Sequence, residues 1–174
     1  CYNSNITTQE DAEENFLNMF DVSITKHVAF KNYIAKEPVI DNRIFLNGNR
    51  LFFLEPMESS STQAYIEMAR AVFDYYLQGK VSAVHVKEDM TKYIKQLQNF
   101  MIWHYQSGSK YDTPFWDYAK SLTFKDETFD KFLEYSKLYD CIPITYGGAT
   151  QNKLYGQWPA YSFKNWNEGI NLNT

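Results

Sequence analysis

Apolar residues recur every three or four positions in several stretches of the chain, and this spacing predicts amphipathic helices. The first stretch follows Thr7-Thr8-Gln9-Glu10, which resembles a capping box, and continues to Phe20. The longest two run from Tyr65 to Leu77, with Gly79 ending the pattern, and from near Lys87 to His104. Because these two helices are consecutive, we expect them to pack as an antiparallel pair.

Shorter helical patterns follow in the second half of the chain. Thr113 precedes a proline, an arrangement typical of a helix N-cap followed by a first-turn proline. We expect the two rings that come next, Phe115 and Trp116, to pack in the core. A further helix is expected over residues 123–138, and Trp158-Pro159 precedes a last helical stretch.

The first half of the chain also carries short extended patterns. Residues 27–35 mix β-branched and aromatic side chains before a proline, which favours a strand. A second apolar run over residues 43–46 stops at Asn47-Gly48-Asn49, and a third follows over residues 51–54. The pattern indicates a strand, a tight turn and a new element, so we expect a mainly α fold with a minor β part.

Length, charge and cysteine content narrow the class of protein. The 174 residues are 44% hydrophobic, which is enough for a core without disulfides or metal ions. A net charge of -4 with no Lys/Arg block argues against nucleic-acid binding. Cys1 and Cys141 match no disulfide framework, and no apolar run is long enough to span a membrane. We expect a soluble, cytoplasmic protein that does not bind membranes.

Several kinds of chemistry have no support in the sequence. The three histidines have no partners at metal-ligand spacing, so we expect no metal site. There is no Gly-x-Ser-x-Gly elbow of a serine hydrolase. No Gly-x-Gly-x-x-Gly follows a strand, so the primary dinucleotide-binding motif is missing.

The chain is rich in aromatic residues, with 14 Tyr, 13 Phe and 4 Trp. These rings either fill the core or line a site for a flat ligand, and composition alone does not distinguish the two.

The stretch from Asn47 to Thr62 is the richest in candidate chemistry. A strand enters a glycine turn and then passes through Pro56 into a helix, whose N-terminus favours an anion or the polar edge of a ligand. Gly48 would let a ligand approach the backbone closely. On spacing alone, however, Glu58 and Ser59 are ordinary first-turn residues, and Asn49 is a turn residue that tolerates a left-handed conformation.

Four motifs occur in a fixed order along the chain. The central one is Glu55-Pro56-Met57-Glu58-Ser59-Ser60. It is preceded by Tyr2-Asn3-Ser4 with the helix start at residues 7–12, and followed by Asp112-Thr113-Pro114-Phe115-Trp116. The last motif runs from Leu154-Tyr155-Gly156 through Asn165-Trp166. Together these motifs extend over nearly the whole chain, and in this order they resemble the flavin-dependent halogenases of the tryptophan halogenase family.

The resemblance implies halogenation chemistry and roles for particular residues. Such enzymes use reduced FAD, oxygen and a chloride or bromide ion to generate hypohalous acid, which reaches an aromatic substrate through a tunnel. A lysine holds the oxidant, and a glutamate that aligns with Glu58 assists as a base and stabilises positive charge. Ser59 and Ser60 fall near the halide and the lysine. The resemblance also implies that Gly48, Asn49, Pro56 and Ser60 belong to a segment that contacts the flavin.

The substrate positions implied by the resemblance lie near the end of the chain. Tyr155 and Trp166 align with residues that contact an indole. Tyr161 replaces a glutamate that binds the amino group of free tryptophan, and Asn165 replaces a phenylalanine. We therefore expect another indole, a phenol or a peptide-borne ring to be as suitable as free tryptophan. Ser61 stands where a glycine is usual, and there it would crowd the halide or offer it a hydroxyl.

The resemblance covers only the C-terminal portion of a halogenase. Residues 1–62 would be the end of the FAD-binding module and residues 63–174 the helical substrate-binding portion. The family's Trp-x-Trp-x-Ile-Pro motif and catalytic lysine are missing, so we expect the segment alone to be inactive. A separate flavin reductase is an implied partner, and a homodimer is left open. Two alternatives stay open: a flavin-dependent aromatic monooxygenase, and a non-catalytic helical module that binds an aromatic ligand.

Overall fold

The computed structural model describes residues 2–54, 60–106, 109, 111–123, 129, 153–155 and 158–159, the last two ranges by their backbone alone. Most of the regular structure is helical, which confirms a mainly α protein with a minor β part. The helices are α1 (Gln9–Met19), the 3-10 turn η1 (Gly48–Arg50), α2 (Ser60–Arg70), the π-helical segment η2 (Ala71–Tyr76), α3 (Ala83–Gln106) and α4 (Pro114–Lys120). The strands are β1 (Tyr33–Ile34), β2 (Val39–Ile40), β3 (Ile44–Phe45), β4 (Phe52–Phe53), β5 (Lys153–Tyr155) and β6 (Trp158–Pro159).

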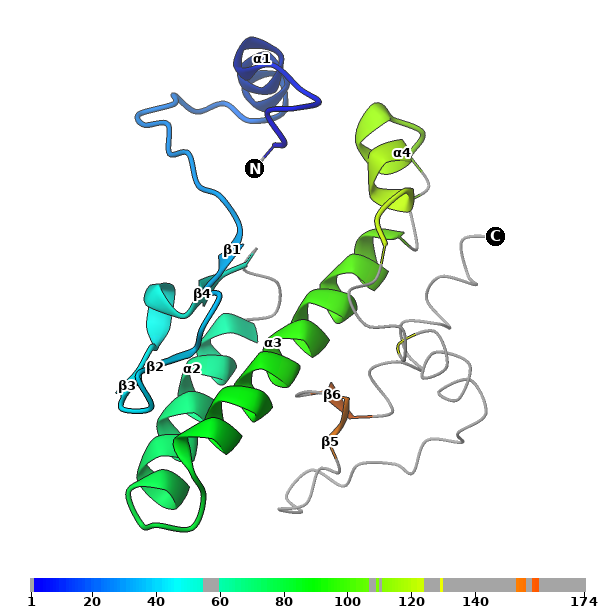
Figure 1. The fold of residues 1–174 in the computed structure, drawn as a ribbon. Coiled ribbons are helices and arrows are strands. Elements are labelled where there is room, and N and C mark those ends of the chain that lie inside the picture. The colour runs from blue at the N-terminus through cyan, green and yellow to red at the C-terminus, as the bar shows by residue number, and fades with distance from the viewer. Residues whose placement is uncertain are drawn as a thin grey trace, which may run out of the picture.

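An antiparallel pair of helices, α2 with η2 and then α3, forms the centre of the fold (Figure 1). The pair confirms the expectation from helical periodicity. Its facing sides carry the core, which includes Met68, Met90, Ile94, Leu97 and Phe100. At about 25 cal/mol per Å² of apolar area, this burial is the main source of stability. α3 begins at Ala83, earlier than the sequence predicted, because Ser82 Oγ accepts a 3.3 Å hydrogen bond from the backbone N–H of His85.

The π-helical segment η2 directly continues α2. The N–H of Leu77 donates to the carbonyl of Val72, five residues earlier, at 2.9 Å. Gly79 then ends the helix with a φ of 68°, the left-handed conformation that glycine adopts readily. The predicted end at Gly79 is therefore confirmed, but the change from α to π geometry was not predicted.

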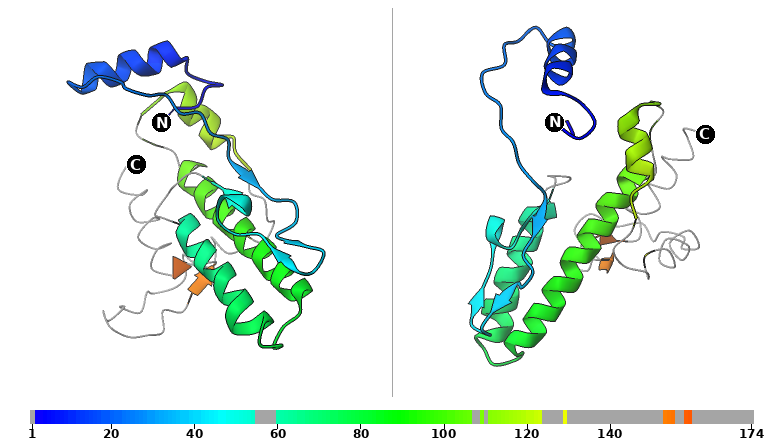
Figure 2. Two further views of the ribbon diagram at one scale, coloured as in Figure 1. Left: turned by 90° about the vertical axis from the view of Figure 1, so that its left-hand side faces the viewer. Right: turned by 45° about the horizontal axis from the view of Figure 1, so that its top comes forward.

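The first four strands form two antiparallel pairs, whose partners the sequence did not predict. β2 and β3 form a hairpin in which Val39 pairs with Phe45, and β1 pairs with β4. The hairpin loop has three residues, Asp41–Arg43; Asp41 and Asn42 have φ values of 50° and 56°, and the N–H of Arg43 donates to the carbonyl of Ile40 at 3.1 Å. The predicted order of a strand, a tight turn and a new element over residues 43–54 is confirmed, as β3, η1 and β4. η1 redirects the chain from one strand pair to the other, and Figure 2 shows both pairs beside the helices.

α1 lies beyond the end of the helical pair and is joined to it by residues 20–32 (Figures 1 and 2). Its N-cap is Thr8, whose Oγ1 accepts a 3.1 Å hydrogen bond from the N–H of Asp11. The predicted capping pair, Thr7 and Glu10, is therefore displaced by one residue. No residue of α1 is buried.

α4 begins at Pro114 as predicted, but Thr113 at its N-cap makes no side-chain capping bond. Phe115 and Trp116 are half-buried and pack against Tyr105, with ring centroids 5.9 Å and 6.2 Å away. In the predicted helix over residues 123–138, Phe129 is buried and packs near Trp103, while most other positions lie outside the described residues. The predicted last helical stretch also lies outside them. Among the helices that the structure describes, none has the length and hydropathy needed to cross a bilayer.

Candidate functional site

The η1 turn presents an open backbone position at Gly48. Asn47 Oδ1 accepts a 2.8 Å hydrogen bond from the N–H of Gly48, and the N–H of Leu51 donates to the Gly48 carbonyl at 2.9 Å. Gly48 has a φ of 57°, and no atom lies within 4 Å of the place where a Cβ would stand. A ligand can therefore reach the backbone here, and a side chain at this position would strain it.

Asn49, the neighbouring candidate, is fixed by α2. Its Oδ1 accepts a 3.1 Å hydrogen bond from the hydroxyl of Tyr65, which also donates to the carbonyl of Phe52 at 3.0 Å. The alternative interpretation of Asn49 as a left-handed turn residue is wrong. The non-glycine residues with positive φ in the described part of the chain are Asp41 and Asn42.

Two further contacts tie the turn to its surroundings. The Tyr33 hydroxyl donates to the carbonyl of Asn49, and it also lies 2.6 Å from the carbonyl of Arg50. Asn47 Nδ2 donates to the backbone carbonyl of Tyr65 at 3.2 Å. Sequence reasoning missed Tyr33 and Tyr65, because both bond to residues 16 or more positions away. The only available signal was their tyrosine identity, a ring with a polar tip.

Tyr65 is held in its protonated form. Burial raises the pKa of its hydroxyl above the ordinary value, a smaller lowering comes from the nearby Ser61 hydroxyl, and the Tyr33 phenol raises it further. Tyr65 therefore stays a hydrogen-bond donor toward Asn49 at physiological pH. The influence of Ser61 does not amount to a well-directed bond, and Ser61 Oγ is buried without a hydrogen-bond partner among the described residues.

Ser60 and Ser61 occupy the first described turn of α2, which contacts η1. Ser60 is completely buried. The structure thus places the candidates Gly48 and Asn49 beside the helix that carries Ser60. Backbone N–H groups of a helix start, together with a buried hydroxyl, form a polar environment suited to an anion.

The other predicted site residues are not placed by the structure. Those that lie outside the described residues are Pro56, Glu58, Ser59, Tyr161, Asn165 and Trp166. For Tyr155 the structure gives the backbone, which lies in β5 opposite Trp158 of β6. Their roles therefore stay predictions.

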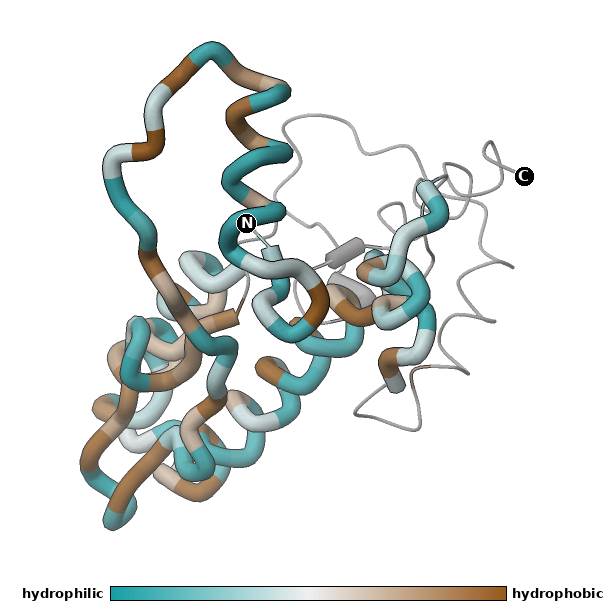
Figure 3. Tube along the Cα trace, turned by 90° about the horizontal axis from the view of Figure 1, so that it is seen from above, coloured by the Kyte–Doolittle hydropathy of each residue, from teal (hydrophilic) through white to brown (hydrophobic). Residues whose placement is uncertain are grey.

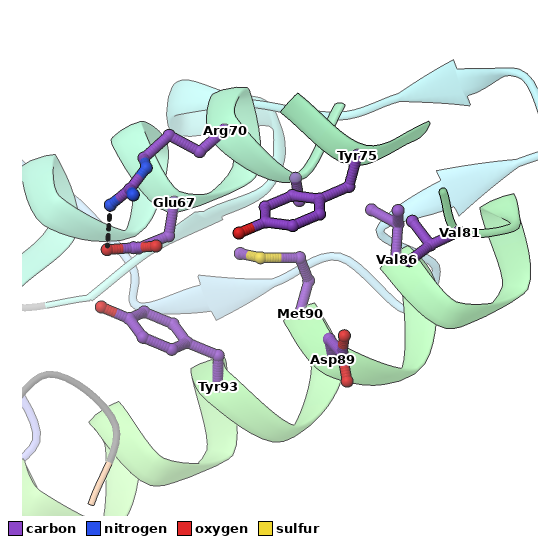
Figure 4. A pocket seen from close by; sticks show the side chains of 9 residues that line it. Glu67, Arg70, Tyr75, Val81, Val86, Asp89, Met90 and Tyr93 are labelled. Atoms are coloured by element: carbon purple, nitrogen blue, oxygen red, sulfur yellow. Dashed lines mark ion pairs between the residues drawn. The ribbon is translucent and has the colours of Figure 1, made fainter. Parts of the chain in front are cut away.

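A separate pocket lies between α2 with η2 and α3. Its volume is about 340 Å³, and it is lined by Glu67, Arg70, Ala71, Tyr75, Val81, Val86, Asp89, Met90 and Tyr93. Figure 4 shows the Tyr75 ring beside Met90 and an ion pair between Arg70 and Glu67, at 3.7 Å. Burial and the Glu67 charge raise the pKa of Tyr93. The sequence analysis did not identify this pocket, because its walls come from two helices that it treated only as core.

No group of three potential metal ligands is found among the described residues. The chemistry available around η1 is that of amide, hydroxyl and backbone groups together with the exposed guanidinium of Arg50. Such groups bind a polar ligand or an anion by hydrogen bonding.

The comparison with known proteins defines the class. A tryptophan halogenase family model matches residues 1–166, and the chain belongs to the tryptophan halogenase family. It is 26% identical over 176 residues to the tryptophan 6-halogenase ThaL of Streptomyces albogriseolus, an alignment that covers 97% of this chain and 32% of that protein. The chain thus spans about a third of the length of this curated relative. The match confirms the resemblance found in the sequence.

Proposed function

We propose that this chain is the C-terminal part of a reduced-FAD-dependent halogenase that chlorinates or brominates an indole-like aromatic substrate with oxygen and halide. The observation that carries the proposal is the family match over residues 1–166, which includes the Glu55-Pro56-Met57-Glu58-Ser59-Ser60 motif. The relative ThaL is named a tryptophan 6-halogenase. Because the chain spans about a third of ThaL, the rest of the active site would come from the remainder of the complete enzyme.

The η1 turn fits a flavin nucleotide. The open side of Gly48 leaves room for a bulky ligand against the backbone. Tyr65 holds the side-chain oxygen of Asn49, so the exposed Asn49 amide group can donate to a ligand oxygen. Gly48, Asn49, Pro56 and Ser60 would hold this part of the cofactor. When bound, reduced FAD supplies the electrons that activate oxygen.

Glu58 would act on the aromatic ring. Electrophilic attack on a ring carbon creates positive charge and a proton that must leave, and an ionised carboxylate stabilises the first and accepts the second. Ser59 would lie beside it at the helix start. The halide would bind near Ser60 and Ser61, where a buried hydroxyl without a partner in the described structure can donate to an anion.

The substrate would be held by Tyr155 and Trp166, whose rings suit a flat guest. Tyr161 and Asn165 would border it without a carboxylate for an amino group. The substrate class is therefore an indole, a phenol or a peptide-borne ring, with free tryptophan not required. A separate flavin reductase would supply the reduced cofactor. The proposed cytoplasmic location rests on Cys1 and Cys141, which match no disulfide framework.

The experiment supplies the complete enzyme with reduced FAD, oxygen, chloride or bromide and a panel of indoles and phenols, and identifies products by mass spectrometry. We expect halogenated product, and we expect Glu58→Gln to lower its rate about 100-fold or more, because general-base catalysis contributes typically 10²–10⁴-fold. Glu88→Gln, an exposed carboxylate on α3, is the matched control and keeps the wild-type rate.

Two results would favour the alternatives. Hydroxylated product formed without halide would identify an aromatic monooxygenase. Tight binding of an aromatic ligand by the 174-residue chain alone, with no turnover in the complete protein, would favour the non-catalytic module.

A further inference from the structure

The pocket between α2, η2 and α3 lies on a different face of α2 from the η1 turn. Glu67 lines the pocket, whereas Tyr65, two residues earlier, donates its hydroxyl to Asn49 of η1. Residues two apart in an α-helix are about 200° apart around its axis, so the two sites lie on nearly opposite sides of α2. The pocket is therefore separate from the proposed flavin contact, and its ligand does not follow from the proposed function.

The walls of the pocket are helix faces. The α3 wall consists of residues spaced by three or four positions, which share one face of a helix: Val86, Asp89, Met90 and Tyr93. Figure 3 shows hydrophobic and hydrophilic positions interspersed along the chain, as helices with one apolar face require. Val86 and Met90 are buried and supply apolar surface, while Asp89 is exposed. The volume of about 340 Å³ is near the lower end for small-molecule sites, roughly 300–1,000 Å³, so the pocket suits a single ring system.

Aromatic side chains suit the pocket to a flat, positively charged ligand. Figure 4 shows the Tyr75 ring over the Met90 side chain, and Tyr93 lines the pocket from the next turn of α3. Burial, and to a smaller extent the Glu67 charge, raises the pKa of Tyr93, so its ring stays neutral. The faces of neutral tyrosine rings attract cations, and thioethers contact aromatic rings favourably. The Tyr75 ring has such a contact in this structure, since Lys80 Nζ lies 5.6 Å from its centroid.

The charges around the pocket favour a cation over an anion. Arg70 lines the pocket, but its guanidinium already lies 3.7 Å from Glu67 and 3.9 Å from Asp74. Lys80 is not among the described lining residues, and it donates to the backbone carbonyl of Asp74 at 3.0 Å. Asp89 makes no ion pair within the part of the chain that the structure describes. These three carboxylates and two cations leave one net negative charge beside the apolar surface.

An inorganic cation finds too few ligands here, because no group of three potential metal ligands occurs among the described residues. We propose that the pocket binds an arylalkylammonium compound, a small amine with one aromatic ring. Its ammonium group lies beside the Asp89 carboxylate, and its ring packs against Tyr75 and Met90. Such a compound matches both the acidic group and the aromatic, apolar surface next to it.

Titrations that follow the Met90 methyl group by NMR measure binding at this pocket specifically. The complete protein carries methyl-labelled methionine, and the probe is phenethylammonium in the absence of flavin and halide. We expect the Met90 resonance to shift along a saturable curve, while the resonance of Met19, an exposed residue of α1, stays in place. A Met90 resonance that does not move at millimolar probe concentrations would overturn the proposal.

Three matched probes test the chemical class of the ligand. Phenethyl alcohol keeps the ring and loses the charge, butylammonium keeps the charge and loses the ring, and hydrocinnamate keeps the ring and reverses the charge. Each should bind about fivefold or more weakly than phenethylammonium, as expected from the loss of one ion pair or one cation–π contact. Equal or tighter binding of any of the three would overturn the proposed class, because the ammonium, the ring or the sign of the charge would then be irrelevant.

Matched variants test the two assigned contacts. Asp89→Asn is expected to weaken phenethylammonium binding about fivefold and to leave phenethyl alcohol binding unchanged. Glu88→Gln removes the same charge from a neighbouring position that does not line the pocket, and it should change neither. Tyr75→Ala should weaken the binding of both probes, whereas Tyr118→Ala, at an equally exposed tyrosine of α4, should weaken neither. Equal effects within either pair would overturn that contact. The titrations need no turnover, so their outcome is independent of whether the complete protein halogenates.

Discussion

The Tyr65 hydroxyl lies 3.1 Å from the side-chain oxygen of Asn49, and this contact joins the second turn of α2 to the η1 turn. This hydrogen bond fixes the orientation of the Asn49 side chain, although Asn49 is exposed to solvent. A binding group that is already oriented loses less entropy when a ligand arrives. Tyr65 is therefore a positioning residue for the proposed flavin contact.

Tyr65→Phe removes the hydroxyl and keeps the ring. We expect the free energy of unfolding to fall by about 1 kcal/mol, the net value of a typical hydrogen bond. In the complete enzyme, the affinity for reduced FAD should fall several-fold, measured by titration under anaerobic conditions. Tyr118→Phe, on the exposed side of α4, is the control and should leave flavin affinity unchanged. Unchanged affinity in Tyr65→Phe would show that Asn49 does not need this contact.

Gly48→Ala separates backbone strain from ligand binding. Because Gly48 has a φ of 57° with open space around it, alanine should cost about 1–2 kcal/mol of stability through backbone conformation. Gly79, with a φ of 68° and equally open surroundings, provides a matched variant with a similar stability loss. Only Gly48→Ala should also weaken flavin binding. If both variants bind flavin alike, Gly48 is a turn residue without a ligand role.

Ser61→Ala tests the buried hydroxyl. A buried polar group without a partner destabilises the fold. The free energy of unfolding of the variant, measured by chemical denaturation, should therefore be about 1 kcal/mol higher than that of the wild type. In contrast, Ser121→Ala loses the 2.6 Å bond from Ser121 Oγ to the Tyr118 carbonyl and should be no more stable than wild type. In the complete enzyme, Ser61→Ala should raise the chloride concentration needed for half-maximal rate. An unchanged halide dependence would exclude Ser61 from the halide site.

The elevated pKa of Tyr93 predicts a loss of stability in alkali. A phenol with a higher pKa in the folded state binds its proton more tightly there, so its stabilisation is complete below about pH 10 and is lost as the pH rises further. Tyr93→Phe should reduce the slope of unfolding free energy against pH above that value. Glu67→Gln should reduce it by less, because burial is the larger cause and the Glu67 charge the smaller. Identical slopes for wild type and Tyr93→Phe would contradict the prediction.

The helices could be predicted because their apolar spacing reflects one continuous core. Positions such as Met68, Ile94 and Leu97 were recognised from period alone, and all three are buried. The β2–β3 hairpin could not be recognised in the same way, since two-residue strands are too short to show alternation. Its signal was Asp41-Asn42, a pair that tolerates left-handed conformations, whereas the turn predicted at Asn47-Gly48-Asn49 is the separate turn η1.

The sequence proposed residues for the candidate site but not the contacts that hold them in place. Gly48 and Asn49 were identified from a string of letters and a family resemblance, and the structure places them beside the start of α2. Tyr33 and Tyr65 hold that turn through contacts that depend on the chain folding back on itself. Such contacts between distant positions leave no local pattern, so a single sequence does not reveal them.

The π-helical segment Ala71–Tyr76 determines the directions in which the side chains at the end of this helix point. One additional residue per turn rotates Tyr75 and Tyr76 relative to an α-helical continuation, by roughly 100°. Tyr76 consequently meets Phe45 of the hairpin at 4.6 Å, while Tyr75 lines the pocket shared with α3. Deleting a single codon in this segment would restore regular winding and rotate both rings by roughly 100°, which would separate the hairpin from the helix. The number of residues in this segment is therefore constrained, whichever side chains it carries.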